Sequence, residues 1–390
     1  MKVLDIFSGA GGFSLGFKLA DYNIIGAVEV DKWASETFAY NFKDTKLLIE
    51  DIQKIPNEVF LEQFSNNRPD VILASPPCQG FSICKKNHGD PKDPRNSLFK
   101  EFLRVGKILK PEYIIMENVP TLVKAKTDTN ESIIGIIKNA LEEIGYHVYW
   151  EVLDASQYGV PQIRRRLFII ASKRELKKPF PEATHYFSDR GQLNYFLEPC
   201  PTLWDAISDL PEIHAGEGKE EMNYHRLPSN CYQETIRFSS QKVYNHVAMK
   251  HSKRTVERFY TMSWGDSLAD VPEHLKPYKR NGKGIISDKI YEQNSRRLHP
   301  DKPCHTIPAS FYANFVHPYA HRNFTAREGA RIQSFPDWFV FKGKPTVVSQ
   351  KLLEREGRLS EKHLCQYNQI GNAVPPVLAK AIAIHLKEIT

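Results

Sequence analysis

The chain has 390 residues, of which 41% are apolar and 25% are charged. These proportions are typical of a globular protein with a sizeable core, and they exclude a disordered chain, a fibrous chain and a disulfide-stapled miniprotein. The six cysteines include no C-x-x-C pair, which indicates reduced thiols. The sequence contains no apolar run of roughly 18 residues, so we expect a cytoplasmic protein without a membrane segment or signal peptide.

The net charge of +7 is unevenly divided along the chain. Residues 1–172 carry 21 Lys and Arg against 22 Asp and Glu, whereas residues 173–390 carry 32 against 24. A solubilising surface is one interpretation of this excess. The asymmetry between the halves favours the other, a polyanionic partner for the second half.

Short apolar runs alternate with helical patterns through the first half, as is typical of βαβ units around a mostly parallel sheet. The regular spacing of apolar residues from Ile133 to Ile144 predicts a crossover helix. The fold class is therefore α/β. About seven strands are predicted, at Val3–Phe7, Ile24–Val28, Lys46–Ile49, Val71–Ala74, Tyr113–Met116, His147–Leu153 and Leu167–Ala171.

Prolines from about Pro179 onward interrupt this rhythm and predict a domain boundary near residue 180. The following stretch mixes short strands, turns and basic-aromatic segments. Residues 375–389 then predict an apolar terminal helix, with Pro376 suited to its first turn.

A glycine-rich turn, S-G-A-G-G, follows the first strand at residues 8–12. Its glycines allow a sharp turn and a close approach to a ligand. Glu29 ends the second strand 20 residues after Gly9, where a carboxylate can accept hydrogen bonds from ribose hydroxyls. A nucleoside-bearing cofactor is therefore expected. Asp51, after the third strand, suits an adenine amino group, and Phe7 suits a ring face, although ordinary turn and cap roles are the alternative.

The fourth strand leads into S-P-P-C-Q-G-F-S, which places Cys78 just beyond a buried strand. A thiolate there is suited to nucleophilic attack, and the alternative is a buried structural thiol. Glu117 ends the fifth strand, where a buried carboxyl with a raised pKa can donate a proton to a ring nitrogen.

Three consecutive arginines lead into the seventh strand. Alternate residues share a face, so Arg164 and Arg166 are expected to point into the site and Arg165 away from it. A solvated basic run is the alternative.

Seven features occur in order: F-S-G-A-G-G, the acidic Glu29 turn, S-P-P-C-Q-G-F-S, E-N-V, Q-x-R-x-R, R-L-H-P-D-K-P-C-H-T-I (297–307) and Q-I-G-N-A-V-P-P (369–376). With them the chain resembles the cytosine-C5 DNA methyltransferases of bacterial restriction-modification systems over residues 4–378. The resemblance implies a discontinuous Rossmann-like domain, residues 1–180 and 365–390, that uses S-adenosyl-L-methionine. It also implies a small DNA-binding domain, residues 181–364, with a target-recognition region at about 181–295. Residues 222–302 hold 15 Lys and Arg, 8 Asp and Glu and nine aromatic residues, which suits nucleic-acid binding.

In this family Cys78 would add to C6 of a cytosine flipped out of double-stranded DNA. Glu117 would act at N3, Arg166 at O2, and Arg164 would support them. The resemblance also implies a cofactor site, whose residues are Phe7, Gly9, Ala10, Gly11, Gly12, Glu29, Val30, Asp51, Ile52, Pro77, Leu98, Asn372 and Ala373. Residues 83–99 would form a mobile loop over the base, Cys84 matches no catalytic position, and 343–367 is an insertion of open role.

We expect a monomer that pairs functionally with a cognate restriction endonuclease and holds no metal. His317 and His321, with Cys304 and His305 nearby, lack the second close pair of a zinc site. Three alternatives remain: a transfer-RNA methyltransferase of the same family, disfavoured because its C-F-T tripeptide is absent here; a catalytically silent DNA-binding protein; and a nicotinamide-dependent oxidoreductase.

Overall fold

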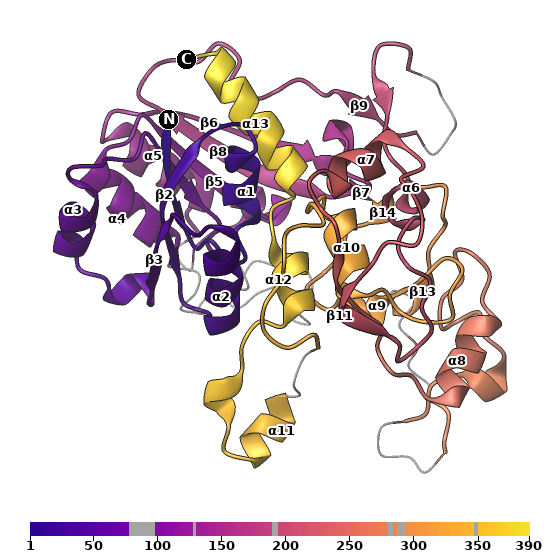
Figure 1. Cartoon of the computed structure of the whole chain (residues 1–390). Coiled ribbons are helices and arrows are strands. Elements are labelled where there is room, and N and C mark those ends of the chain that lie inside the picture. Colours follow the sequence, from indigo (N-terminus) through magenta and orange to yellow (C-terminus); the bar gives the residue numbers. More distant parts are fainter. Residues whose placement is uncertain are drawn as a thin grey trace. The chain divides into compact units, whose positions relative to one another are not determined.

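The computed structural model describes residues 1–77, 98–127, 130–188, 194–279, 284–287, 290, 294–346 and 350–390. Cys78, Cys84 and all but the last two residues of the predicted loop 83–99 lie outside this set. The chain divides into two compact units. Unit 1 comprises Met1–Gly159, Arg164–Glu198 and Ala373–Thr390, and unit 2 comprises Val160–Ile163 and Pro199–Asn372 (Figure 1).

Unit 1 is built on a seven-stranded sheet in the order β3-β2-β1-β4-β5-β8-β6. Its strands are β1 (Lys2–Ile6), β2 (Asn23–Glu29), β3 (Lys46–Ile49), β4 (Val71–Ala74), β5 (Tyr113–Asn118), β6 (His147–Asp154) and β8 (Arg165–Ser172). The first five sheet positions are parallel, whereas β8 is antiparallel to both β5 and β6. The seven predicted strands are confirmed. Because β8 runs the other way, its first residues lie at the same edge as the last residues of β5, with Leu167 opposite Asn118.

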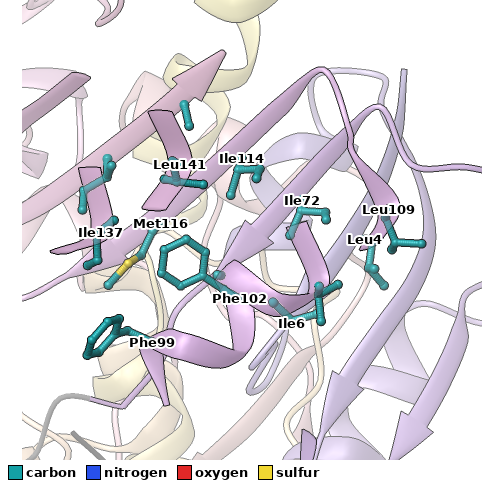
Figure 2. Packing of buried hydrophobic residues seen from close by; sticks show 14 of the residues in the cluster. Leu4, Ile6, Ile72, Phe99, Phe102, Leu109, Ile114, Met116, Ile137 and Leu141 are labelled. Carbon is teal, nitrogen blue, oxygen red and sulfur yellow. The ribbon is translucent and has the colours of Figure 1, made fainter. Parts of the chain in front are cut away.

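Helices cover both faces of this sheet. They are α1 (Gly12–Lys18), α2 (Lys32–Asn41), α3 (Asn57–Phe64), α4 (Phe99–Leu109), α5 (Ile133–Glu142) and α13 (Pro376–Glu388), with the 3-10 turns η1 (Ile52–Lys54), η3 (Pro120–Lys124) and η4 (Ala155–Tyr158). On one face α3, α4 and α5 enclose the main hydrophobic cluster, in which Phe102 of α4 packs among Ile72, Ile114 and Met116 of the strands (Figure 2).

Helix α1 lies on the other face, where Phe13 meets Phe168 of β8 edge to face. The C-terminal helix α13 packs against α1 (Figure 1). Their approach is so close that a Cβ on Gly16 would lie 2.3 Å from the Cβ of Ala379. The last helix is therefore a structural part of the first unit.

Unit 2 contains short elements with little periodicity. Its helices are α6 (Leu203–Ile207), α7 (Cys231–Arg237), α8 (Lys253–Tyr260), α9 (Phe311–Asn314), α10 (Ala326–Ile332), α11 (Gln350–Arg355) and α12 (Gln366–Asn372), with turns η5 (Glu273–Leu275) and η6 (Leu359–Glu361). Its strands pair as β7 (Gln162–Ile163) with β14 (Cys304–His305), β11 (Gly218–Met222) with β12 (Val243–Val247), and β13 (Arg296–Arg297) with β15 (Phe315–Val316). A further small pair joins β9 (His185–Tyr186), which belongs to unit 1, to β10 (Glu198–Pro199), which spans the boundary between the units in the chain.

The interior of unit 2 contains buried ion pairs alongside its buried apolar side chains. Arg322 binds both carboxylate oxygens of Glu328, at 2.8 and 2.9 Å. Arg331 binds the carboxylates of Asp209 and Asp337. These groups are almost completely buried, so each charge depends on its partner. Within the described parts of the chain, no helix has the length and apolar character needed to cross a bilayer.

Candidate active site

The predicted catalytic and cofactor residues of unit 1 follow neighbouring strands at one edge of the sheet. Taken in sheet order, they come after β3, β2, β1, β4 and β5, and at the start of the antiparallel β8. Carboxyl ends of parallel strands meet at one edge, which is where open α/β sheets bind ligands. The topology thus gathers these groups into one row.

Glu117, at the end of β5, forms an ion pair with an arginine of β8. The Nε of Arg166 lies 3.1 Å from Oε1 of Glu117, and both side chains are largely buried. Burial raises the pKa of Glu117 above its ordinary value, while the charges of Arg166 and Arg164 oppose that rise. The site therefore holds an acid whose proton is retained to higher pH, beside a fixed cation.

Arg164 is held through both its backbone and its side chain. Its N–H donates to the side chain of Asp154 at 3.2 Å, and its Nη2 donates to the carbonyl of Ala373 at the same distance. Arg164 is buried and Arg165 is exposed, as the predicted alternation requires. The charge of Arg164 acts on Glu117, so both inward-facing arginines contribute to one cluster.

The chain that leads to Cys78 is attached to the end of β5. Nδ2 of Asn118 donates to the carbonyl of Pro76 at 3.2 Å, and its Oδ1 accepts from the N–H of Val119. Pro77 is exposed, and Cys78 itself lies outside the described residues. Asn118, which follows Glu117 in the chain, thus holds the segment that leads to the predicted nucleophile.

Glu29 organises the glycine-rich turn through its carboxylate. Its Oε2 accepts from the N–H of Gly9 at 2.7 Å, and its Oε1 accepts from the N–H groups of Val30 and Asp31. A carboxylate offers about four acceptor positions, so three backbone bonds leave about one for a ligand hydroxyl. These bonds give Glu29 the ordinary turn role that the sequence left open as the alternative to ligand binding.

The glycines of the turn have different surroundings. Gly9 has a φ of +55°, and a Cβ there would meet no atom of the described residues within 4 Å. Gly11 has a φ of +94°, but a Cβ there would lie 2.6 Å from the ring of Phe42. Gly9 therefore faces open space, whereas Gly11 is required by packing. Ala10 and Gly12 are buried, and Gly12 begins α1.

The remaining predicted cofactor residues divide by exposure. Val30 is 65% exposed, and Asp51 is half-buried and caps η1 through the N–H of Gln53. Ile52 belongs to the hydrophobic core, so only its backbone remains for a ligand. Phe7, in a left-handed conformation, packs partly on the same core, and Leu98 is half-buried immediately before α4.

Asn372 is exposed at the end of α12 in unit 2, and Ala373 begins the last segment of unit 1. The two residues thus belong to different units. The carbonyl of Ala373 accepts the hydrogen bond from Nη2 of Arg164.

Two aspartates, the buried Asp5 and the half-buried Asp154, were missed by the sequence reasoning. Oδ2 of Asp5, in β1, accepts from the hydroxyl of Ser14 in α1 at 2.6 Å, while its Oδ1 is buried without a partner among the described residues. Burial raises the pKa of Asp5 to about 7. Asp154 caps η4 through Ser156 and also receives Arg164. A polar residue inside an apolar strand, as in V-L-D-I, was the available signal for Asp5.

The histidines considered for zinc have other partners. Nδ1 of His317 accepts from the N–H groups of Tyr319 and Ala320, and its Nε2 lies 3.7 Å from Glu328. Burial raises the pKa of the Cys304 thiol, which disfavours the thiolate that a metal would need. In the described portion of the chain, no cluster of three metal-ligating side chains occurs.

Comparison with known proteins first identifies the fold. The structure resembles the crystal structure of a putative DNA modification methyltransferase encoded within an E. coli prophage, with a TM-score of 0.73, 27% identity and coverage of 100% and 99% of the two chains. The seven-stranded sheet is thus that of an α/β methyltransferase. A Spodoptera frugiperda DNMT2 structure, at 22% identity and a TM-score of 0.51, shares this fold.

The sequence then identifies the family. The model of the C-5 cytosine-specific DNA methylase family matches residues 1–388. The type II methyltransferase M.DdeI of Desulfomicrobium norvegicum is 44% identical over 98% of this chain and 88% of its own length. The type II methyltransferase M1.HphI of Haemophilus parahaemolyticus is 34% identical over 98% and 86%. The chain belongs to the C-5 cytosine-specific DNA methylase family, and the predicted class of enzyme is confirmed.

Proposed function

We propose that this protein methylates C5 of a cytosine within a specific word of double-stranded DNA, with Cys78 as the nucleophile and S-adenosyl-L-methionine as the methyl donor. The observation that carries the proposal is the cluster of Glu117, Arg166 and Arg164 beside the anchored Pro76. A buried acid next to fixed cations suits a pyrimidine ring on which negative charge develops.

The residues at the ends of β1, β2 and β3 fit the cofactor. Gly9 faces open space, Glu29 retains about one acceptor position for a ribose hydroxyl, and Val30 offers an exposed apolar surface. Asp51 would accept a hydrogen bond from the adenine amino group. The rest of the site would consist of Phe7, Ala10, Gly11, Gly12, Ile52, Pro77, Leu98, Asn372 and Ala373. The bound cofactor supplies the methyl group.

The chain's own residues would prepare the base. C5 of cytosine is a weak nucleophile until a group adds to C6, and the Cys78 thiolate is suited to that addition. Glu117 would donate a proton or hydrogen bond at N3, and Arg166 would hold O2. After methyl transfer, loss of the C5 proton to water and departure of the Cys78 thiolate would release the product.

Unit 2 would bind the DNA. The target base must leave the duplex, at a cost of a few kcal/mol, and phosphate contacts to basic side chains would offset it. The surplus of cations over residues 222–302 supports this role. From the sequence motifs we propose residues 1–180 and 365–390 for catalysis, 181–364 for DNA binding and about 181–295 for target recognition; within these bounds, 181–198 lie in unit 1 and 365–372 in unit 2.

Type II methyltransferases are named among the relatives, which supports a role in restriction-modification. We propose that the protein acts as a monomer in the bacterial cytoplasm and protects host DNA from a cognate endonuclease. Bisulfite sequencing of DNA from cells that express the protein would map the modified cytosine. Methylation of cytosine within a single recognition sequence supports the proposal, and unmodified DNA contradicts it.

Substrate class is tested by transfer of a labelled methyl group to duplex DNA and to transfer RNA, with the wild type and Cys78→Ala. We expect label in DNA only, and none with Cys78→Ala. Labelling of RNA alone would favour the RNA-directed alternative, and full activity of Cys78→Ala would refute the covalent route. Calorimetry that compares the binding of S-adenosylhomocysteine with the binding of NAD tests the oxidoreductase alternative, which requires that NAD binds.

A further inference from the structure

Two buried glutamines form a continuous chain of hydrogen bonds within unit 2. Nε2 of Gln162 donates to Oε1 of Gln333 at 2.6 Å and to the carbonyl of Ile332 at 3.3 Å. Oε1 of Gln162 accepts from the N–H of Ile307 at 2.9 Å, and Nε2 of Gln333 donates to the carbonyl of Ile370 at 2.9 Å. The backbone partners fix both amide orientations, because an N–H must face an oxygen acceptor and a carbonyl must face an N–H donor.

This chain of bonds has no access to solvent. Both glutamines are completely buried, as are Ile307, Ile332 and Ile370. Water therefore cannot replace a partner that moves away, and a broken bond would leave buried polar groups unpaired. The two side chains therefore tie together the segments that they join.

The first joined segment is 304–309, which pairs with β7. Cys304 is opposite Gln162 in the β7–β14 ladder, and the hydroxyl of Thr306 donates to the carbonyl of Ile163 at 2.7 Å. Ile163 is followed directly by Arg164 in the chain. Residues 304–307 close the R-L-H-P-D-K-P-C-H-T-I stretch of the proposed DNA-binding domain.

The second joined segment is α12. Nδ2 of Asn368 donates to the carbonyl of Ala309 at 2.8 Å. A Cβ on Gly371 would lie 2.4 Å from the carbonyl oxygen of Pro308, so this glycine allows a contact that no other residue would. Helix α12 ends at Asn372, a proposed cofactor residue.

We propose that Gln162 and Gln333 are positioning residues that make binding of the cofactor and binding of DNA mutually dependent. When DNA binds and segment 304–309 shifts, the N–H of Ile307 that donates to Gln162 moves with it. The displacement then passes through Gln333 to α12 and to Asn372. Such coupling is reciprocal, because each ligand must favour the other by the same factor. The inference rests on the proposed function, which gives Asn372 and the 297–307 stretch their ligands.

The test measures the affinity of the full chain for S-adenosylhomocysteine by calorimetry, with and without a short duplex that contains the mapped methylation site. Wild-type protein should bind S-adenosylhomocysteine more tightly when the duplex is present. The affinity of one linked site typically rises about 5- to 150-fold when the other is occupied. Gln162→Met and Gln333→Met, which keep an unbranched side chain without the hydrogen bonds, should each reduce that gain to nearly one. The double variant should lose nothing more.

Gln157→Met is the matched control, because Gln157 is an exposed glutamine of the same region. It should keep the wild-type gain. A wild-type gain in both single variants, additive losses in the double variant or no gain in the wild type would each overturn the inference. Complete absence of S-adenosylhomocysteine binding by the wild type would instead refute the proposed function, and the coupling with it.

Hydrogen exchange on the wild type tests the same point without any substitution. S-adenosylhomocysteine alone should slow exchange at the amide of Ile307, which donates to Gln162. Unchanged exchange over 304–309 at saturating ligand would overturn the inference.

Discussion

The charge on the Glu117 side chain depends on two opposing effects. Burial favours the neutral carboxyl, and the neighbouring Arg166, with its Nε at 3.1 Å, favours the carboxylate. Burial is the larger effect, so the pKa lies above the ordinary value. A pyrimidine ring entering this cluster would meet a proton donor and a cation together.

Substitution of Glu117 tests that interpretation. Because the protonated carboxyl would be the active form, methyl transfer should slow as the pH rises through the raised pKa. Glu117→Gln should lower kcat by about 10²- to 10⁴-fold, as general acids typically contribute, and should abolish this falling limb of the pH–rate profile. Glu112→Gln, an exposed position immediately before β5, is the control and should resemble the wild type. A Glu117→Gln profile with the same falling limb would exclude Glu117 as the acid.

Asp5 predicts a pH dependence of stability. Its pKa is about 7 in the folded chain against an ordinary 3.8, so the folded state retains a proton that the unfolded state releases. Stability is therefore lost as the pH rises from about 4 to about 7, by at most about 4 kcal/mol. Urea unfolding of Asp5→Asn should show a smaller loss over that range. Equal pH slopes for the two proteins would contradict the assignment.

At the scale of elements, the turn between β1 and α1 separates ligand binding from packing. Gly9 and Gly11 both have positive φ, so alanine at either position should cost about 1–2 kcal/mol. Gly11→Ala also collides with Phe42 and should lose more stability in urea unfolding. Gly9→Ala should weaken S-adenosylhomocysteine binding in calorimetry more than it weakens folding. Wild-type affinity in Gly9→Ala would show that the open space is not the ligand's.

The elements of unit 1 could be predicted because its buried strands are short continuous apolar runs. Ile72 and Ile114, for example, lie in such runs and pack in one cluster. Unit 2 could not be predicted, because strands of two residues leave no periodic pattern. Its interior also holds Arg327 and Arg331, which sequence rules assign to the surface.

The directions of side chains at the candidate site could be predicted where a local motif defines them. The inward direction of Arg164 and Arg166 followed from strand alternation. The bonds from Glu29 to the turn and from Asn118 to Pro76 join segments that are distant in the sequence, so no local pattern indicates them.

At the scale of the whole molecule, the two ends of the chain complete one unit. Helix α13 is 358 residues or more from α1 in sequence, yet Tyr22 donates to the carbonyl of Ala383 at 3.0 Å. Leu378, Ile382 and Leu386 of α13 are completely buried. Unit 1 therefore cannot fold around its N-terminal segments alone.

Truncation measures this dependence. Removal of residues 375–390 deletes the buried face of α13, whose three large apolar side chains alone are worth about 5 to 9 kcal/mol, which is comparable to the stability of a typical domain. We expect the truncated chain to lose its cooperative thermal transition in circular dichroism. Removal of residues 389–390 alone is the control and should retain that transition. Wild-type melting of the longer truncation would contradict this assignment of α13.

The central claim is that the sulfur of Cys78 forms a bond to the target cytosine. A duplex that carries 5-fluorocytosine at the mapped site cannot lose its C5 substituent, so the protein should remain attached to it in the presence of S-adenosyl-L-methionine. Mass spectrometry of the denatured complex should place the DNA on Cys78, and Cys78→Ser should form no complex. A trapped nucleotide on any other residue, or none at all under conditions where unmodified DNA is methylated, would contradict the account.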